Sequence, residues 1–276
     1  MNLDTFKNNP EYYIISANGS LHKENISKNF SESICLKNFL SKDEIEYFTE
    51  QGFQSQPNLT IVPNGQCVIY GNLYPLFDKI KARLCEYLGE EYANSPAVGG
   101  HYVITPCGAG THNDGIKEHR WYDSLDTVPE NDPKRRYVSW KSVLLPLWCH
   151  GHGNTGGHLT LFNERANNFA AGSPKSVFYK PVNPKKSIEY LDINSNKVDT
   201  SYDRLDPKVY ENYIDQSYES VKGFTVENIF EWCPGDVIIF DSTQIHCSSQ
   251  FDKIHNTPFF ANKMALLFTL IKEIDD

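Results

Sequence analysis

Hydrophobic and polar residues follow the period of an amphipathic helix over residues 39–52, FLSKDEIEYFTEQG. Its apolar face carries Phe48, one turn before the end of the segment. Ser41 followed by Glu44 is the Ser-x-x-Glu pattern, in which two side chains cap the first turn of a helix. Gly52 stands where a helix commonly ends, because glycine readily adopts the left-handed conformation of a C-terminal cap. The pattern predicts a helix that is capped by Ser41 and ended by Gly52.

A second amphipathic helix is predicted over residues 75–92. Pro75 stands near its start, where the missing N–H of proline costs the helix no hydrogen bond. Apolar residues recur at helical spacing through the segment, at Phe77, Ile80, Leu84 and Leu88. Together with the polar, weakly patterned residues 1–34, the two helices form an N-terminal helical lead-in over residues 1–95.

After residue 96 the pattern changes to short runs rich in β-forming residues and separated by turn residues. The predicted strands cover 100–106, 137–149, 157–163, 176–182, 236–240 and 263–271. Several short strands with turn signals after a helical lead-in are typical of a sandwich or barrel. We therefore expect a mainly β core with flanking helices over residues 96–272, all within a single domain.

The strand pattern is interrupted over residues 183–230, which are rich in Asn, Lys, Asp, Ser and Tyr. Asp206 and Pro207 can start a helix there, as its N-cap and first residue. Long insertions in compact domains often form lids or binding loops. The same composition also suits a surface excursion without function. We carry both interpretations forward and describe the insertion as lid-like.

Composition narrows the class of protein. The net charge of −9 and the lack of a long basic run make nucleic acid an unlikely partner. No apolar run is long enough to span a membrane, and the first residues lack the apolar core of a signal peptide, so we expect a cytoplasmic protein with no membrane partner. Seven scattered cysteines without a Cys-x-x-Cys pair indicate free thiols in a reducing compartment. No pattern in the sequence indicates an oligomeric state.

Candidate chemistry centres on THNDG, residues 111–115. A His-x-Asp pair alone is weak, because it occurs often by chance. In an extended chain, however, His112 and Asp114 point to the same side and can bind one ion. A third ligand is available at His246, which follows the buried strand 236–240 and a short turn. Two histidines and one carboxylate on one side of a metal suit non-haem Fe(II), with open positions for a cosubstrate and O₂.

In this arrangement the chain resembles the Fe(II)/2-oxoglutarate-dependent dioxygenases, which fold as a double-stranded β-helix, or jelly roll. The matching segments occur in the family's order and cover most of residues 34–272 outside the insertion. They are ICLKNFLSKDEIEYF, HYVITPCGAGTHNDG, SVLLPLWCHGHGNTGGHLTLF, CPGDVIIFDSTQIHCSS and NKMALLFTL. The resemblance implies a jelly-roll core, Fe(II) held by His112, Asp114 and His246, and 2-oxoglutarate and O₂ as cosubstrates.

The resemblance also implies a basic residue that pairs with the far carboxylate of 2-oxoglutarate, because a buried charge needs a partner. Lys263 is the best match, although it follows the distal histidine at a wider spacing than in most relatives. Lys253 and Lys141 are the alternatives. Tyr102 lies where relatives often place a tyrosine that contacts the cosubstrate, although its register is off by about two residues. Its other interpretation is core packing.

We therefore expect an oxygenase that hydroxylates a small metabolite or a peptide side chain, as in the phytanoyl-CoA hydroxylase and prolyl hydroxylase branches. The retained carboxylate of Asp114 disfavours halogenation, because related halogenases lack it. The alternative is a cupin-like jelly-roll module that binds metal without turnover of 2-oxoglutarate. Two weaker metal interpretations remain: a zinc site in the His-rich segment 149–158, and His255 in place of His246.

Overall fold

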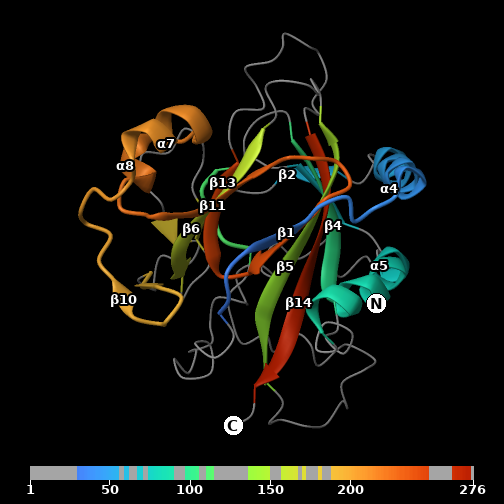
Figure 1. Ribbon diagram of the computed structural model, residues 1–276, viewed down its shortest axis with the longest axis horizontal. Coiled ribbons are helices and arrows are strands. Elements are labelled where there is room, and N and C mark those ends of the chain that lie inside the picture. Colours follow the sequence, from blue (N-terminus) through green and yellow to red (C-terminus); the bar gives the residue numbers. More distant parts are fainter. Residues whose placement is uncertain are drawn as a thin grey trace.

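The computed structural model of the chain describes residues 30–55, 59–61, 67–70, 74–89, 97–105, 110–114, 136–149, 157–166, 170–171, 180–181, 188–248 and 263–274. Antiparallel strands dominate these residues, and helices flank the sheets on two sides (Figure 1). None of the helices in these ranges is long and apolar enough to cross a lipid bilayer. The expectation of a mainly β fold with flanking helices is confirmed.

The larger sheet contains seven of the described strands, in the order β1-β12-β5-β14-β4-β3-β2. They are β1 Ile34–Leu36, β2 Leu59–Ile61, β3 Cys67–Tyr70, β4 Ala97–Thr105, β5 Arg136–Cys149, β12 Val237–Asp241 and β14 Lys263–Ile274. The last strand, β14, lies between β4 and β5 and pairs with both of them. The C-terminal strand therefore completes the centre of this sheet.

The smaller sheet runs in the order β10-β9-β6-β11, and β13 also pairs with β6. Its strands are β6 His158–Ala166, β9 Tyr190–Leu191, β10 Lys197–Val198, β11 Val226–Glu231 and β13 Gln244–Ser248. A separate short pair joins β7 Ala170–Ala171 to β8 Lys180–Pro181.

From β4 onward the chain passes back and forth between the two sheets. β4 and β5 belong to the larger sheet, and β6 and β11 belong to the smaller sheet. The chain then returns to the larger sheet with β12, enters the smaller sheet with β13 and ends in the larger sheet with β14. Between β4 and β5, His112 forms an isolated antiparallel bridge with His246 of β13 and so extends the smaller sheet. Two facing antiparallel sheets connected in this way form a double-stranded β-helix, so the predicted jelly roll is confirmed.

Strand β11 corrects the expected bounds of the insertion. Residues 226–230 were assigned to the insertion, but β11 pairs with β6 and is a strand of the barrel. A β-bulge between Val226 and Asn228 interrupts its register, and this hides the two-residue alternation from a reading of the sequence. The insertion therefore ends at about residue 225.

Side chains from both sheets meet in the barrel interior. Val103 of β4 and Leu161 of β6 lie in one buried cluster, which shows that the sheets face each other. Alternation along β4 sends Tyr102 and Ile104 to the opposite face. The other members of the interior cluster are Leu144, Cys149, Leu159, Trp232, Ile238, Phe240, Ala265 and Leu267.

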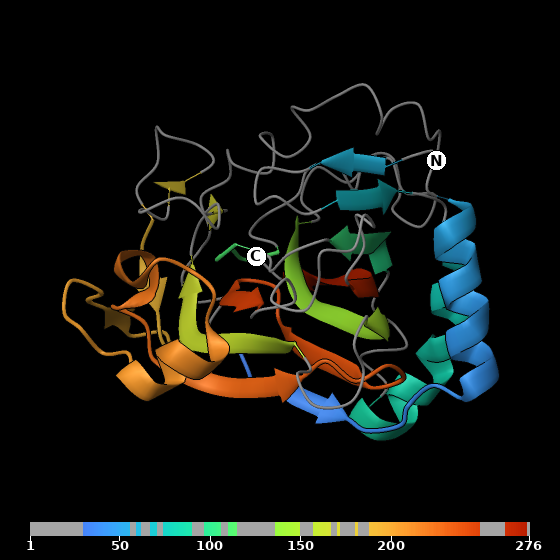
Figure 2. The same ribbon diagram turned by 90° about the horizontal axis from the view of Figure 1, so that it is seen from above.

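The outer face of the larger sheet is covered by helices α4 Lys42–Gln54 and α5 Tyr74–Leu88, which Figure 2 shows side by side along one flank. Both predicted helices are therefore confirmed. The Ser41 and Glu44 capping box is present at the start of α4. The apolar faces of the helices pack on the sheet through Phe48, Phe77, Ile80 and Leu84.

The expected end of α4 is wrong. The helix continues through Gly52 to Gln54 and is capped at Ser55. Gly52 lies against the sheet instead: a Cβ atom at this position would stand 2.7 Å from Met264 Sδ and 3.0 Å from the Tyr102 ring. Glycine is therefore required here for close approach of helix and sheet, and not for a left-handed cap.

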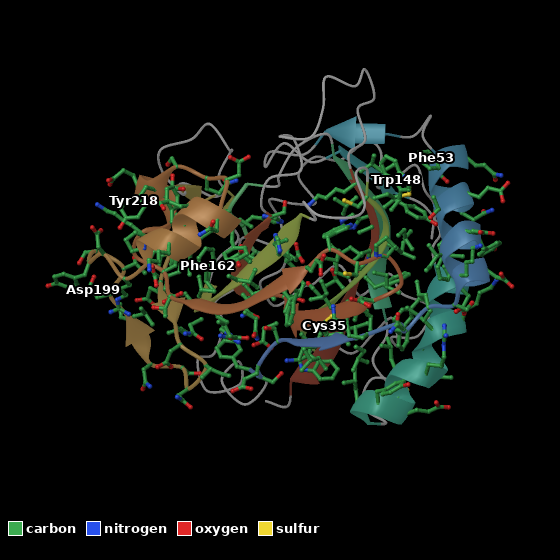
Figure 3. The ribbon with its side chains drawn as sticks, turned by 45° about the horizontal axis from the view of Figure 1, so that its top comes forward. Cys35, Phe53, Trp148, Phe162, Asp199 and Tyr218 are labelled. Atoms are coloured by element: carbon green, nitrogen blue, oxygen red, sulfur yellow. The ribbon has the colours of Figure 1, made fainter. Side chains whose placement is uncertain are left out.

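The described part of the insertion packs on the outer face of the smaller sheet. It contains α7 Pro207–Tyr213, which Asp206 caps as predicted, and α8 Tyr218–Val221. Val221 and Phe224 pack there against Phe162 of β6, which lies beneath this segment in Figure 3. The other apolar members of this cluster are Ala166, Leu205, Ile214, Ile245 and Cys247. The described part of the insertion thus covers this face of the sheet, and its role as a lid stays a prediction.

We predict that Gly52→Ala destabilises the protein by about 1–3 kcal/mol, because the added methyl group overpacks the contact with Tyr102 and Met264. The intrinsic preference of a helix for alanine over glycine, about 1 kcal/mol, acts in the opposite direction. Urea unfolding measures the difference. Glu46→Ala on the exposed face of α4 is the control and should change stability by less than about 0.5 kcal/mol. A stabilised Gly52→Ala protein would contradict the close approach.

Glu164 on β6 is buried and accepts the Thr225 N–H through both carboxylate oxygens, at 3.2 and 3.1 Å. Burial raises the pKa of Glu164 to about 7. The folded state therefore keeps a proton on Glu164 that the unfolded state releases near pH 4.5. The stability that Glu164 contributes at low pH is lost as the pH rises towards 7.

Glu164→Gln removes this ionisation, so we predict a gain of roughly 1–3 kcal/mol in unfolding free energy at pH 8 and a much smaller change at pH 5. Unfolding midpoints in urea at both pH values test this. Glu211→Gln, at an exposed position of α7, is the control and should show no pH-dependent difference. An equal effect of Glu164→Gln at pH 5 and pH 8 would refute the buried ionisation.

Candidate metal centre

The backbone holds the two histidines side by side. His112 N–H donates to His246 O at 2.9 Å, and His246 N–H donates to His112 O at 2.8 Å. Two residues that exchange both backbone hydrogen bonds lie directly opposite each other in an antiparallel ladder, so their side chains leave from the same face. The imidazole ring centroids are 4.2 Å apart.

Backbone carbonyls orient both imidazole rings. Nδ1 of His112 contacts Gly110 O, and Nδ1 of His246 lies 2.9 Å from Gln244 O. A carbonyl oxygen only accepts hydrogen bonds, so each Nδ1 carries the proton and donates it. Each neutral ring then presents the lone pair of Nε2 on its other side, which is the arrangement that a metal-binding histidine needs.

Asp114 is brought to the histidines by a further backbone contact. Its N–H donates to Ser242 O at 3.0 Å, in the turn between β12 and β13. Asp114 Oδ1 then lies 3.5 Å from Nε2 of both His112 and His246. Asp114 Oδ2 is buried and has no hydrogen-bond partner among the described residues.

Three acceptor atoms therefore converge in a buried place, within 4.8 Å of one another. Burial and the neighbouring His246 lower the pKa of His112, which keeps its imidazole neutral. Burial alone would raise the pKa of Asp114, but the neighbouring His246 and His112 outweigh it and hold that pKa well below its ordinary value. A carboxylate and two imidazole lone pairs need a cation between them, so these residues fit a divalent metal.

The metal-ligand residues predicted from the sequence, His112, Asp114 and His246, are thus brought together. They form the one group of this kind among the residues that the structure describes. On the interior side, the Phe240 ring meets the His246 ring edge-on at 4.8 Å. Leu161 lies opposite His246 on β6. This apolar wall excludes water from one side of the group.

β4 places a further histidine near this group, and the sequence analysis overlooked it. His101 alternates with Tyr102 and lies on the same face of the strand as Val103, which points into the interior. Burial lowers the pKa of His101 to about 4, and the Asp114 carboxylate partly opposes this shift. His101 is therefore a neutral residue close enough to Asp114 to interact electrostatically. The alternation of the predicted strand 100–106 was the signal that could have found it.

The expected cosubstrate contact of Tyr102 is not supported. Tyr102 is fully buried on the outer face of the larger sheet, and its hydroxyl donates to Phe48 O of α4 at 2.9 Å. Strand alternation directs it away from the interior that His112 and His246 line. Tyr102 is a packing residue, as its alternative interpretation held.

Lys263 lies inside the barrel. It is the first residue of β14, opposite Cys149 of β5, and only 2% of its surface is exposed. Ala265 and Leu267, which follow on the same face of the strand, belong to the interior cluster. Its ammonium lies 4.4 Å from the centroid of the Trp232 ring. The chain thus places this cation in the same interior as the His112, Asp114 and His246 group.

Lys141, one of the alternatives to Lys263, forms a different buried interaction. Its ammonium forms a buried ion pair with Asp241, whose other oxygen accepts a hydrogen bond from Arg165 Nε at 3.0 Å. Arg165 also pairs with Glu227 at 2.9 Å, and its guanidinium donates to Ser31 O at 3.0 Å. This network ties the segment before β1 to both sheets. It was missed because its members are far apart in the sequence.

The remaining alternatives are only partly described. Lys253 and His255 lie outside the described residues, as do His150 and His152 of the proposed zinc segment. Of that segment, His158 stacks edge-on against Tyr213 at 5.0 Å. These two interpretations therefore gain no support from the described structure.

Comparisons with known proteins find similarity only at the level of structure. No protein-family model matches the chain, and no curated protein matches it. A Pseudomonas putida prolyl-4-hydroxylase aligns over 91% of this chain and 98% of its own, with 9% identity and a TM-score of 0.42. The carbocyclase SnoK from nogalamycin biosynthesis, described as non-heme and alpha-ketoglutarate dependent, covers 92% of this chain and 87% of its own, with 10% identity and a TM-score of 0.46.

A third similar structure is HygX from Streptomyces hygroscopicus with iron bound. It aligns over 91% of this chain and 87% of its own, with 12% identity and a TM-score of 0.38. At these scores the overall likeness does not decide function, which depends on the residues of the site itself.

We predict that His112→Ala abolishes tight binding of Fe(II) while the protein stays folded. One of three ligand atoms is lost, whereas the backbone hydrogen bonds that His112 exchanges with His246 are kept. Anaerobic Fe(II) titration followed by calorimetry measures the affinity, and circular dichroism checks the fold. His158→Ala is the control, because His158 contacts Tyr213 and belongs to no group of potential metal ligands within the described part of the chain. Unchanged Fe(II) affinity in His112→Ala would reject the assigned metal centre.

Proposed function

We propose that the protein is a non-haem Fe(II)- and 2-oxoglutarate-dependent oxygenase that hydroxylates its substrate. The observation that carries this proposal is the buried convergence of His112 Nε2, His246 Nε2 and Asp114 Oδ1. Two histidines and one carboxylate occupy one side of a metal and leave its other positions open, as non-haem Fe(II) oxygenases require. The iron and 2-oxoglutarate, when bound, supply the activation of O₂ for oxidation of the substrate.

The protein's own residues would bind and orient these groups. Gly110 O and Gln244 O hold the imidazole rings of His112 and His246 with Nε2 directed at the metal. Asp114 contributes a charged oxygen, and its retention agrees with hydroxylation and not halogenation.

Lys263 would pair with the far carboxylate of 2-oxoglutarate. A buried dicarboxylate requires a cationic partner, because an unpaired charge in a dry interior is costly. Lys263 is buried and shares the interior with the metal ligands. Leu161, Val103 and Ala265 line the same interior with apolar side chains. Such a lining strengthens the attraction between the ammonium and the carboxylate.

The proposed substrate is a small metabolite or a peptide side chain. The net charge of −9 disfavours nucleic acid and other polyanions, because binding them relies on basic surfaces. For the same reason, screening should begin with neutral and cationic compounds. Proline-containing peptides should be included because of the resemblance to the prolyl hydroxylase branch.

We predict that Lys263→Met weakens 2-oxoglutarate binding about 10- to 100-fold, because methionine fills the space but removes the charge that meets the carboxylate. Fe(II) affinity should not change. The measurement is an anaerobic titration of the Fe(II) protein with 2-oxoglutarate, followed by the weak visible absorption band of the iron complex. Lys197→Met at an exposed position of β10 is the control.

The outcomes separate the candidate functions. A band in the wild type that is absent from His112→Ala and weakened in Lys263→Met supports the proposed oxygenase. Iron binding without any response to 2-oxoglutarate would instead support a cupin-like metal module. An unchanged affinity in Lys263→Met, with a normal wild-type band, would exclude Lys263 as the carboxylate partner.

A further inference from the structure

Trp232 and Lys263 form a stacked pair inside the barrel. Both side chains are 2% exposed, and the Lys263 ammonium lies 4.4 Å from the centroid of the Trp232 ring. Trp232 follows the last residue of β11, in the smaller sheet, whereas Lys263 begins β14, in the larger sheet. The contact therefore crosses the barrel interior from one sheet to the other.

Backbone hydrogen bonds hold Trp232 in place. Trp232 N–H donates to Gly157 O at 2.8 Å, which anchors the residue beside the first residue of β6. Immediately after it, Asp236 N–H donates to Cys233 O at 3.1 Å and closes the turn into β12. A lysine side chain has four flexible carbons, so the position of its charge depends on the groups that hold it. Here a fixed aromatic face is one of those groups.

An indole and a carboxylate can both hold an ammonium group, but they affect its charge differently. A carboxylate cancels the charge of its partner, as Asp241 does for the buried Lys141. An aromatic face is uncharged and attracts the cation through its quadrupole. The contact with Trp232 therefore holds the Lys263 ammonium in position and does not itself cancel the charge.

The charge of Lys263 acts on its neighbour Cys149. Burial raises the pKa of the Cys149 thiol, and the positive charge of Lys263 opposes that shift. The thiol stays protonated and uncharged, so Cys149 does not cancel the ammonium. Cys149 lies opposite Lys263 across the β5–β14 ladder.

We infer that Trp232 is a positioning residue for the cosubstrate: its indole face holds the Lys263 ammonium where the far carboxylate of 2-oxoglutarate meets it. This inference rests on the proposed function. It assigns to Trp232 a part in selecting 2-oxo acids that carry a second carboxylate over those that lack one.

Two variants of Trp232 distinguish the effect of its aromatic ring from the effect of its apolar bulk. Trp232→Phe keeps an aromatic ring, and Trp232→Leu keeps an apolar side chain without one. Each Fe(II)-loaded protein is titrated anaerobically with 2-oxoglutarate and, separately, with pyruvate, which has the 2-oxo acid group but no second carboxylate. Calorimetry measures both affinities.

We expect Trp232→Leu to weaken 2-oxoglutarate binding about tenfold and Trp232→Phe to weaken it less than about threefold. Pyruvate and Fe(II) affinities should stay unchanged in both variants. Trp148→Phe, in the groove beside α4, is the matched control and should bind both acids like the wild type. An unchanged 2-oxoglutarate affinity in Trp232→Leu, or an equal loss for pyruvate, would overturn the inference.

A second measurement does not depend on the folding of Trp232→Leu. The chain has four tryptophans, and the indole of Trp232 lies against the ammonium that is proposed to meet the carboxylate. Saturation with 2-oxoglutarate should change tryptophan fluorescence in the wild type and in Trp148→Phe, but not in Trp232→Phe. A retained change in Trp232→Phe would count against the inference. Failure of the wild type to bind 2-oxoglutarate, with iron bound, would refute the proposed function itself and the inference with it.

Discussion

The candidate site depends on one pair of backbone hydrogen bonds, those that His112 and His246 exchange. The two residues come from distant parts of the chain, and no continuous strand contains both. Because the pair is a directly opposed antiparallel bridge, both rings must leave the smaller sheet on its inner side. The same bridge brings Asp114 within reach, since its own N–H is bound to Ser242 in the turn just before β13. Loss of this bridge would separate all three ligand residues at once.

Buried charges lie in two different surroundings among the described residues. Around Asp241, each charge has an opposite partner: Lys141 and Arg165 share its carboxylate, and Arg165 also reaches Glu227. These pairs join the segment before β1 to both sheets and have a structural role. At the candidate site, Asp114 keeps an oxygen without a hydrogen-bond partner among the described residues, and the Lys263 ammonium lies against the face of the Trp232 ring. An anion without enough donors and a cation against a neutral ring, in one interior, suit a metal and a dicarboxylate.

The parts of this architecture that could be predicted are those that local patterns encode. The capping box of α4, the Asp206 cap of α7 and the long strands were all visible, because each depends on neighbours within a few residues. The three candidate ligand residues were predicted from their order along the chain and from the family resemblance. Gly52 was misread because its contact is with β14 and Tyr102, far away in sequence. Strand β11 was missed because a bulge breaks its alternation, and the Asp241 network was missed because only the tertiary fold brings its members together.

The error at Tyr102 shows how packing far from the site decides what faces it. Alternation alone leaves two choices for β4: either Tyr102 and Ile104, or His101 and Val103, point inward, and a shift of one residue exchanges them. The hydroxyl of Tyr102 binds Phe48 O on α4, and Gly52 provides the space for its ring. These contacts commit Tyr102 to the helix side, so His101 must face Asp114. The lead-in helix thus helps to determine which side chains surround the candidate metal centre, although it contributes no residue to it.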